Sequence, residues 1–521
     1  MIHVFYLIPY ISLLFNLVLV PKTESGPVPP TPNIILIMAD DIGFSDISSY
    51  GGEIPTPNID RLAAEGLRFR QFYNMAKCEV SRSVMLTGLY DKNPAAQSMV
   101  SLIRNEGYQT YQFGKEHFQE WVPERCYAKN NMDQSLTFWA TTEYFVPPDG
   151  KFSRPFYLNG ERVEVKDLEF EQKPFYKTDV FTDYAVKYIK KASKDKEPFF
   201  LFMPYHAPHY PLQARPEDIA RFRGKYKIGW DVLRQQRYER MIEMGVLDKN
   251  HELSNPTSNI NQFRGHPKGD EEIRALIPKY RPWSDLTEEE KDALDLEMSV
   301  YAAMIHRLDL NIGRLLDTLD EENLTENTLV IYLSDNGACP YDSNRDFDSP
   351  PGGAHSYRTQ TAAWSNLSNT PFRYFKQFGH EGGTHTHFIA RWPNVIKNAG
   401  GFISQPGHLV DIFPTLLEVT GGEYPEWEEE TKVPPLDGSS LLPLFEGKER
   451  KEPEFFISGF GENFRMFRKG DWKIVRKNGE PWELYNMADD MTETTNLMDE
   501  KEGIGNSLIE EYTQRSKTTD K

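Results

Sequence analysis

At four places along the chain, a mostly apolar run ends directly in polar residues. The runs occupy residues 33–39, 108–114, 198–205 and 328–333. A near-continuous apolar run is what a strand buried on both faces of a parallel sheet requires. Between the runs, periodic patterns predict helices over residues 56–69, 181–191 and 286–319. This alternation predicts an α/β fold with a large doubly wound, mostly parallel sheet sandwiched by helices.

The polar residues after these runs are expected at one edge of the sheet. Ligands of open α/β sheets bind outside the carboxyl ends of the strands. The residues delivered to that edge are Asp40, Asp41, Lys115, His117, His206, His209, Asp335 and Asn336. Because chance seldom aligns all the runs in this way, the pattern predicts an active site at this edge.

The oxygen-bearing members of this set indicate a metal site. Asp40, Asp41, Asp335 and Asn336 are the hard oxygen ligands that Ca²⁺ or Mg²⁺ prefers. Taken singly, Asp-Asp is also a helix cap and Asp-Asn-Gly a turn, but their pairing at two strand ends favours a ligand set. Zinc would favour an imidazole ligand, so Asn336 points to one oxygen-bound cation.

After about residue 440 the pattern changes to short amphipathic strands and a final helix near residues 507–512. This predicts a catalytic domain over residues 33–440 and a smaller antiparallel α+β subdomain over residues 441–521. Residues 248–285 form a polar excursion. Residues 338–370 read as a long loop, which next to a site motif is usually a lid or a specificity loop.

The N-terminus predicts export. Residues 4–20 are almost wholly apolar, and small residues follow at 23–26, so we expect a signal peptide over 1–25 and a Pro-rich linker over 26–32. An uncleaved membrane anchor is the alternative, although the run is short and is interrupted by Pro9 and Asn16. The expected protein is periplasmic or secreted, with no stable membrane span after cleavage.

The net charge restricts the expected binding partners, and the cysteine count restricts the expected class of protein. The net charge of −19 argues against nucleic acid and requires a local basic funnel for any anionic substrate. Three cysteines in an exported chain exclude a disulfide scaffold. Beyond Cys78, Cys126 and Cys339 either form one bridge or stay as buried thiols.

Residues 74–90 contain Cys78-Glu-Val-Ser-Arg82, followed by Leu-Thr-Gly88. This stretch resembles the maturation signature of the type I sulfatases of the alkaline phosphatase superfamily, Cys-x-Pro/Ala-Ser-Arg with Leu-Thr-Gly downstream. Val80 stands where that family usually has Pro or Ala. In the family, a formylglycine-generating enzyme oxidises the cysteine to formylglycine (3-oxoalanine), whose hydrate is the catalytic nucleophile.

Further motifs extend the resemblance over about residues 32–500. They are Gly114-Lys-x-His117, Ala207-Pro-His209 and Phe372-Arg-Tyr-Phe-Lys376 with Glu-Gly-Gly downstream. The resemblance implies an arylsulfatase-like sulfuric ester hydrolase. It also implies that one calcium ion is held by Asp40, Asp41, Cys78 (as formylglycine), Asp335 and Asn336. Residues 382–387 depart from the family's Gly-Gly-x-Arg-x-Pro and add histidines.

The implied mechanism gives each side chain a role. The hydrate at position 78 attacks sulfur, and Arg82, Lys115 and Lys376 neutralise the developing charge. His209 protonates the leaving alcohol, and His117 takes the proton that releases sulfate. Predicted substrate contacts are Lys115, His206, Lys376 and His385. For the additional histidines, structural hydrogen bonding and a second metal stay open as alternatives.

The expected substrate is an aryl sulfate or, favoured by the long loop and the extra histidines, a sulfated oligosaccharide or polysaccharide fragment. A phosphate or phosphonate monoester hydrolase of the same superfamily is the nearest alternative. A non-catalytic binder of sulfated glycans is another. The complete set of charged site residues argues against the non-catalytic binder.

Overall fold

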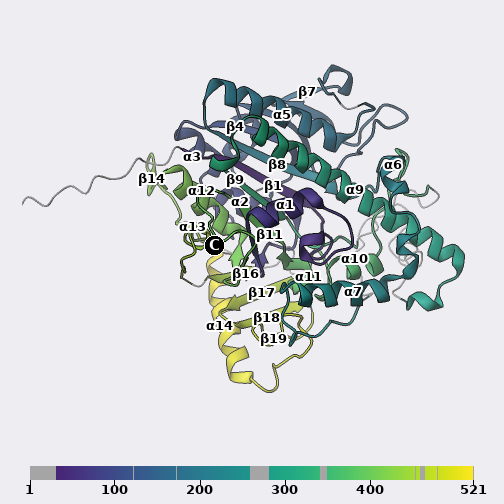
Figure 1. The fold of residues 1–521 in the computed structure, drawn as a ribbon. Coiled ribbons are helices and arrows are strands. Elements are labelled where there is room, and N and C mark those ends of the chain that lie inside the picture. The colour runs from purple at the N-terminus through teal and green to yellow at the C-terminus, as the bar shows by residue number, and fades with distance from the viewer. Residues whose placement is uncertain are drawn as a thin grey trace, which may run out of the picture. The chain divides into compact units, whose positions relative to one another are not determined.

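In the part of the chain that the computed structural model describes, a 10-stranded sheet carries the predicted apolar runs in its middle (Figure 1). Its order is β12-β2-β11-β9-β1-β8-β4-β5-β6-β7. The bounds are β1 Asn33–Asp40, β2 Leu67–Phe69, β4 Gln109–Glu116, β5 Gln134–Trp139, β6 Phe156–Leu158, β7 Glu161–Val163, β8 Phe199–Pro208, β9 Thr328–Ser334, β11 Phe388–Arg391 and β12 Phe402–Ile403. The neighbours β9, β1, β8, β4 and β5 pair in parallel, which confirms the four predicted strands and the fold class.

The structure describes residues 31–120, 122–171, 173–257, 281–340, 349–451, 453–457, 464–477 and 479–519. The predicted signal peptide and most of the linker lie outside these residues, as do much of the polar excursion and part of the long loop. Within them, no helix combines the length and the apolar character needed to cross a membrane. From residue 32 onward, the described part of the chain forms one compact unit.

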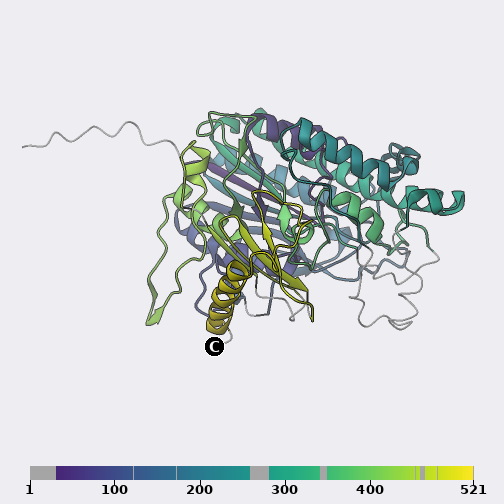
Figure 2. The ribbon, with the colours of Figure 1, turned by 90° about the horizontal axis from the view of Figure 1, so that it is seen from below.

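Helices cover both faces of the sheet. Side chains of a buried strand point alternately to the two faces, so each face is apolar and is covered by helices. In β1, Ile35 and Ile37 pack with α1, α5 and α9, whereas Leu36 and Met38 pack with α2, α3 and α12. Figure 2 shows the sheet between these layers, with the long helix α9 along one side. The helices are α1 Pro57–Glu65, α2 Cys78–Thr87, α3 Met99–Asn105, α4 Ala128–Asn131, α5 Lys177–Asp195, α6 Pro216–Ala220, α7 Trp230–Glu243, α9 Glu288–Glu321, α10 Ala362–Ser368, α11 Glu381–Thr384, α12 Ile412–Thr420, α13 Leu442–Phe445 and α14 Glu502–Thr519.

Two predicted elements differ from the structure. The helix predicted over 56–69 ends at Glu65, and residues 67–69 instead form β2, because the extended Gly66 lets them pair with β11 and β12. The stretch predicted as a long loop contains α10 between Ala362 and Ser368. Its side chains are all buried, so packing rather than local pattern decides this helix.

The C-terminal strands form a separate antiparallel sheet, as predicted. Its four strands among the described residues are β16 Glu454–Ile457, β17 Phe464–Lys469, β18 Trp472–Lys477 and β19 Glu483–Asn486. Helix α14 lies beside them and is longer than the predicted segment (Figures 1 and 2). Short pairings complete the fold, namely β3 Phe72–Tyr73 with β10 His385–Thr386 and β13 Gly407–His408, and β14 Trp427–Glu428 with β15 Thr431–Lys432.

Candidate active site

The carboxyl ends of β1 and β9 bring the predicted oxygen ligands together. Asp40 ends β1, Asp335 and Asn336 follow β9, and all three are fully buried. The Asp41 backbone N–H donates to Asp335 Oδ1 at 3.4 Å, and Asn336 Nδ2 donates to Asp41 Oδ1 at 2.6 Å. Asp41 has a φ of 69°, a left-handed conformation that its surroundings must stabilise. Tyr301 of α9 does so by donating to the Asp41 carbonyl at 3.0 Å.

Three of these side chains each keep one oxygen without a hydrogen-bond partner among the described residues. The atoms are Asp40 Oδ1, Asp41 Oδ2 and Asn336 Oδ1, and all are buried. Buried oxygens left unpaired are costly, and a hard divalent cation is coordinated by such oxygens. Oxygens of Asp40 and Asp335 also lie within 4.8 Å of Cys78 Sγ. These residues therefore fit a site for one oxygen-coordinated cation.

Three buried cations lie against the same carboxylates. Lys115 Nζ donates to Asp40 Oδ2 at 2.6 Å, and Arg82 Nη2 donates to Asp335 Oδ2 at 2.8 Å. Lys376 Nζ donates to Asp41 Oδ1 at 2.5 Å. Burial raises the pKa of Asp40, but the charges of Lys115 and its neighbours outweigh it and hold that pKa well below the usual range. Positive charges gathered around a carboxylate cluster favour an anion beside it.

Helix α2 begins at Cys78, and its motif explains how the thiol is held. Ser81 Oγ donates to the Asp335 carbonyl at 2.6 Å and accepts from the Met75 N–H at 3.0 Å, which ties the helix start to the strand ends. Arg82 lies one turn after Cys78 and therefore on the same side of the helix. Gly88 ends the helix at a φ of 68°, where its N–H donates to the Val84 carbonyl, a conformation that favours glycine.

A chain of polar contacts leads from Cys78 toward the surface. Cys78 Sγ lies 3.3 Å from His117 Nδ1, and His117 Nε2 lies 3.2 Å from Glu79 Oε2. Lys77 Nζ donates to Glu79 Oε1 at 2.7 Å. Burial raises the pKa of the Cys78 thiol, but Lys115, Lys376 and His117 together bring it well below its ordinary value. Sequence reasoning missed Glu79, whose one signal was its position next to Cys78.

Comparison with known proteins agrees with this geometry. The family model described as Sulfatase matches residues 32–422. An uncharacterized sulfatase of Schizosaccharomyces pombe is 31% identical, with 92% of each chain covered. The arylsulfatase of Klebsiella aerogenes is 30% identical over 80% of this chain and 93% of its own. The chain belongs to the sulfatase family.

This membership makes the chain a type I sulfatase of the alkaline phosphatase superfamily and a sulfuric ester hydrolase. The fold agrees as well. The crystal structure of Ps i-CgsB in complex with k-i-k-neocarrahexaose superposes with a TM-score of 0.65 at 22% identity, with 93% of each chain covered.

In this sulfatase, Lys376 is positioned by close backbone packing before α11. Its N–H donates to the Ala338 carbonyl at 3.1 Å. A Cβ added at Gly337 would lie 1.9 Å from the Gly382 carbonyl oxygen, and one added at Gly382 would lie 2.2 Å from the Tyr374 carbonyl oxygen. Both glycines are therefore required by the approach of the turn at Asp335 and Asn336 to the segment that carries Lys376.

The predicted histidines separate into two groups. His209 Nε2 lies 3.6 Å from Asp41 Oδ2, and the His206 ring stacks on the His209 ring at 4.8 Å, so both belong to the site. His385 does not join it. Its Nδ1 lies 2.8 Å from Glu381 Oε2, and its Nε2 lies 2.8 Å from the Arg70 carbonyl oxygen. Because the protein itself occupies both nitrogens, His385 has a structural position rather than the predicted substrate contact.

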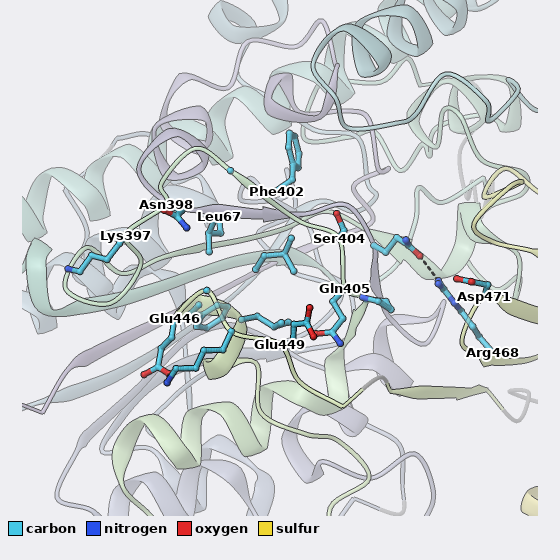
Figure 3. Close-up of a pocket in the computed structure, with 18 residues that line it drawn as sticks. Leu67, Lys397, Asn398, Phe402, Ser404, Gln405, Glu446, Glu449, Arg468 and Asp471 are labelled. Atoms are coloured by element: carbon cyan, nitrogen blue, oxygen red, sulfur yellow. Dashed lines mark hydrogen bonds and ion pairs between the residues drawn. The ribbon is translucent and has the colours of Figure 1, made fainter.

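A separate cavity lies away from these residues. Figure 3 shows it beside Phe402 of β12, with Arg468 on one wall and Lys397 and Glu446 on another. Its volume is 640 Å³, and none of the site residues described above lines it. Arg468 is already occupied there, since its Nη1 donates to Gln71 at 2.6 Å. The cavity is therefore distinct from the active site.

Proposed function

We propose that this sulfatase is an exported enzyme that hydrolyses sulfate esters of carbohydrates, using formylglycine derived from Cys78 and one bound calcium ion. The observation that carries the proposal is the position of Cys78. It lies at the start of α2, 3.3 Å from His117 Nδ1, beside buried cations and beside carboxylates with unpaired oxygens.

The calcium ligands would be the side chains of Asp40, Asp41, Asp335 and Asn336, together with residue 78. The donor set is all oxygen once residue 78 is converted, which suits calcium rather than zinc. When bound, the cation supplies charge that polarises a sulfate oxygen and lowers the pKa of the nucleophile. Formylglycine at position 78 supplies a hydrated aldehyde, whose second hydroxyl allows sulfate to leave without attack by water.

The chain's own residues bind the ester and move the protons. Lys115, Lys376 and Arg82 face the place where charge develops on the sulfate oxygens. His209, in the loop after β8, would protonate the leaving alcohol. His117 already contacts the side chain of residue 78, so it is placed to accept a proton from that residue.

Carbohydrate is the favoured substrate class. A structural neighbour is a complex with an oligosaccharide, and His206 adds a buried imidazole beside His209. Export rests on the apolar residues 4–20. A formylglycine-generating enzyme is the implied partner. Val80, two residues after the modified position, is half-buried on the first turn of α2.

The test is the chemical state of residue 78 together with substrate preference. Cleavage after lysine releases residues 78–92 as one peptide, whose mass should show replacement of the thiol by a carbonyl oxygen. The enzyme should hydrolyse a sugar sulfate and an aryl sulfate faster than the matched aryl phosphate. Cys78→Ala should be inactive, whereas Cys126→Ala, at another buried thiol, should retain activity. Full activity with an unmodified Cys78 thiol would refute the formylglycine proposal.

A further inference from the structure

His206 is a buried imidazole whose two nitrogens have different surroundings. It lies in β8 and is 1% exposed. Its Nδ1 lies 2.7 Å from Lys177 Nζ. Its Nε2 has no hydrogen-bond partner among the described residues. A ring nitrogen of His206 and one of His209 lie with an oxygen of Asp40 within 4.8 Å of one another. His206 therefore connects Lys177 to the active site.

Lys177 is buried without being part of the site. It begins α5 and is 1% exposed. Its Nζ donates to the Thr142 carbonyl at 2.6 Å. The same nitrogen lies over the rings of Phe138 and Tyr144, at 4.4 and 4.2 Å from their centroids. Burial lowers the pKa of Lys177 well below its usual value, whereas the two ring faces favour its ammonium form. The Thr142 carbonyl can only accept, so Nζ acts as a donor on that side.

The remaining neighbour of Lys177 Nζ is His206 Nδ1. An imidazole nitrogen that accepts a hydrogen bond carries no proton, so a ring that accepts at Nδ1 is neutral and has one N–H. If Lys177 donates to Nδ1, that proton must be on Nε2. His206 Nε2 itself has no hydrogen-bond partner among the described residues, so a proton on it is available to an oxygen bound in the site.

We propose that Lys177 is a positioning residue that fixes His206 as the Nε2–H tautomer, so that His206 donates a hydrogen bond to an anionic oxygen on the Asp40 side of the sulfate site. The inference rests on the proposed function, because that oxygen belongs to the bound ester. It has a second consequence. An Nε2–H offers no lone pair, so His206 cannot join Asp40 and His209 as a ligand of a second metal ion.

The tautomer can be read directly by long-range ¹H–¹⁵N correlation spectra of calcium-loaded protein labelled at its 12 histidines. The His206 signals are those missing from His206→Phe. We expect Nδ1 at the position of an unprotonated nitrogen and Nε2 at that of a protonated one. In Lys177→Met the preference should weaken or reverse. A wild-type His206 protonated on Nδ1 would overturn the proposal.

A double-mutant cycle tests whether Lys177 acts through His206. Lys177→Met and His206→Phe should each lower kcat/KM for a sulfate ester about 10- to 100-fold, the value of a hydrogen bond to a charged group. The double variant should lose no more than either single variant. Lys187→Met, an exposed position on the same helix, should leave kcat/KM unchanged.

If the fold-loss of kcat/KM in the double variant equals the product of the two single losses, or if Lys177→Met leaves kcat/KM unchanged, Lys177 has no role through His206. The proposed function and the tautomer of His206 can fail independently. A wild-type protein that turns over no sulfate ester contradicts the proposed function, whereas its NMR spectrum still reports the tautomer. That spectrum also decides the matter where Lys177→Met does not fold.

Discussion

Replacing Lys473 with methionine should lower the free energy of unfolding by about 3–5 kcal/mol, because it removes one partner of a buried ion cluster. Lys473 is in β18 of the C-terminal sheet. Its Nζ lies 2.5 Å from Glu381 Oε1 of α11 and 2.7 Å from Glu493 Oε1. All three side chains are fully buried. Methionine keeps most of the aliphatic stem but removes the ammonium group that lies between the two carboxylates.

The shift in the pKa of Glu381 gives a similar magnitude for the contribution of this cluster to the free energy of unfolding. Burial raises this pKa, but Lys473 and His385 lower it from 4.5 to about 2. A shift of that size corresponds to about 3 kcal/mol. Because the folded-state pKa lies below the unfolded value, this stabilisation is present above pH 4.5 and is lost as pH falls through about 2. In Lys473→Met the carboxyl should titrate at higher pH, so the acid-sensitive part of the stability should shrink.

Urea unfolding followed by tryptophan fluorescence and far-UV circular dichroism, at neutral pH and at stepwise lower pH, measures both effects. The matched control is Lys469→Met in the neighbouring strand β17, where an exposed lysine pairs with Glu511 at 2.7 Å. That surface pair should contribute at most about 1 kcal/mol. If both variants lose the same small amount, with the same dependence on pH, the buried cluster does not stabilise the protein as argued.

Three further predictions concern the site. Calcium chelation should abolish turnover and added calcium should restore it, and Asp335→Asn should lose both metal and turnover while its circular dichroism spectrum stays unchanged. Stoichiometric zinc in the active enzyme would contradict the ligand set. His209→Ala should slow a sugar sulfate ~10²–10⁴-fold and a nitrophenyl sulfate far less, because only the sugar leaving group needs a proton; equal losses in kcat/KM would remove His209 as the acid. Burial lowers the pKa of His117, but Cys78 and Glu79 raise it above its usual value, so Glu79→Gln should lower it. The acid limb of the pH–rate profile, which requires neutral His117, should then move to lower pH, and an unmoved limb would separate Glu79 from catalysis.

The architecture was largely readable from local pattern. A strand buried on both faces must be apolar at nearly every position, so residues 33–39 and 328–333 identify central strands without any neighbour being known. The parallel topology then places whatever follows each strand at one edge, which is why Asp40, Asp335 and His209 could be grouped before any geometry was available. The predicted helix over 56–69 was too long because Leu67 and Phe69 are apolar in either structure, and only pairing with β11 makes this segment a strand.

By itself the sequence determined the strands of the central sheet and which charged residues follow them, because each depends on composition and spacing along one segment. That this edge of the sheet carries the active site stays a prediction. The tertiary structure alone decided which groups touch. Glu79 meets His117, Lys177 meets His206, and Lys473 meets Glu381, although in the last pair the partners are 92 residues apart. Whether a buried histidine binds substrate or is held by the protein depends on such contacts, as the occupied nitrogens of His385 and the unpaired Nε2 of His206 show. Local sequence contains no signal for them, because a hydrogen bond across the fold is set by packing and not by the periodicity of either segment.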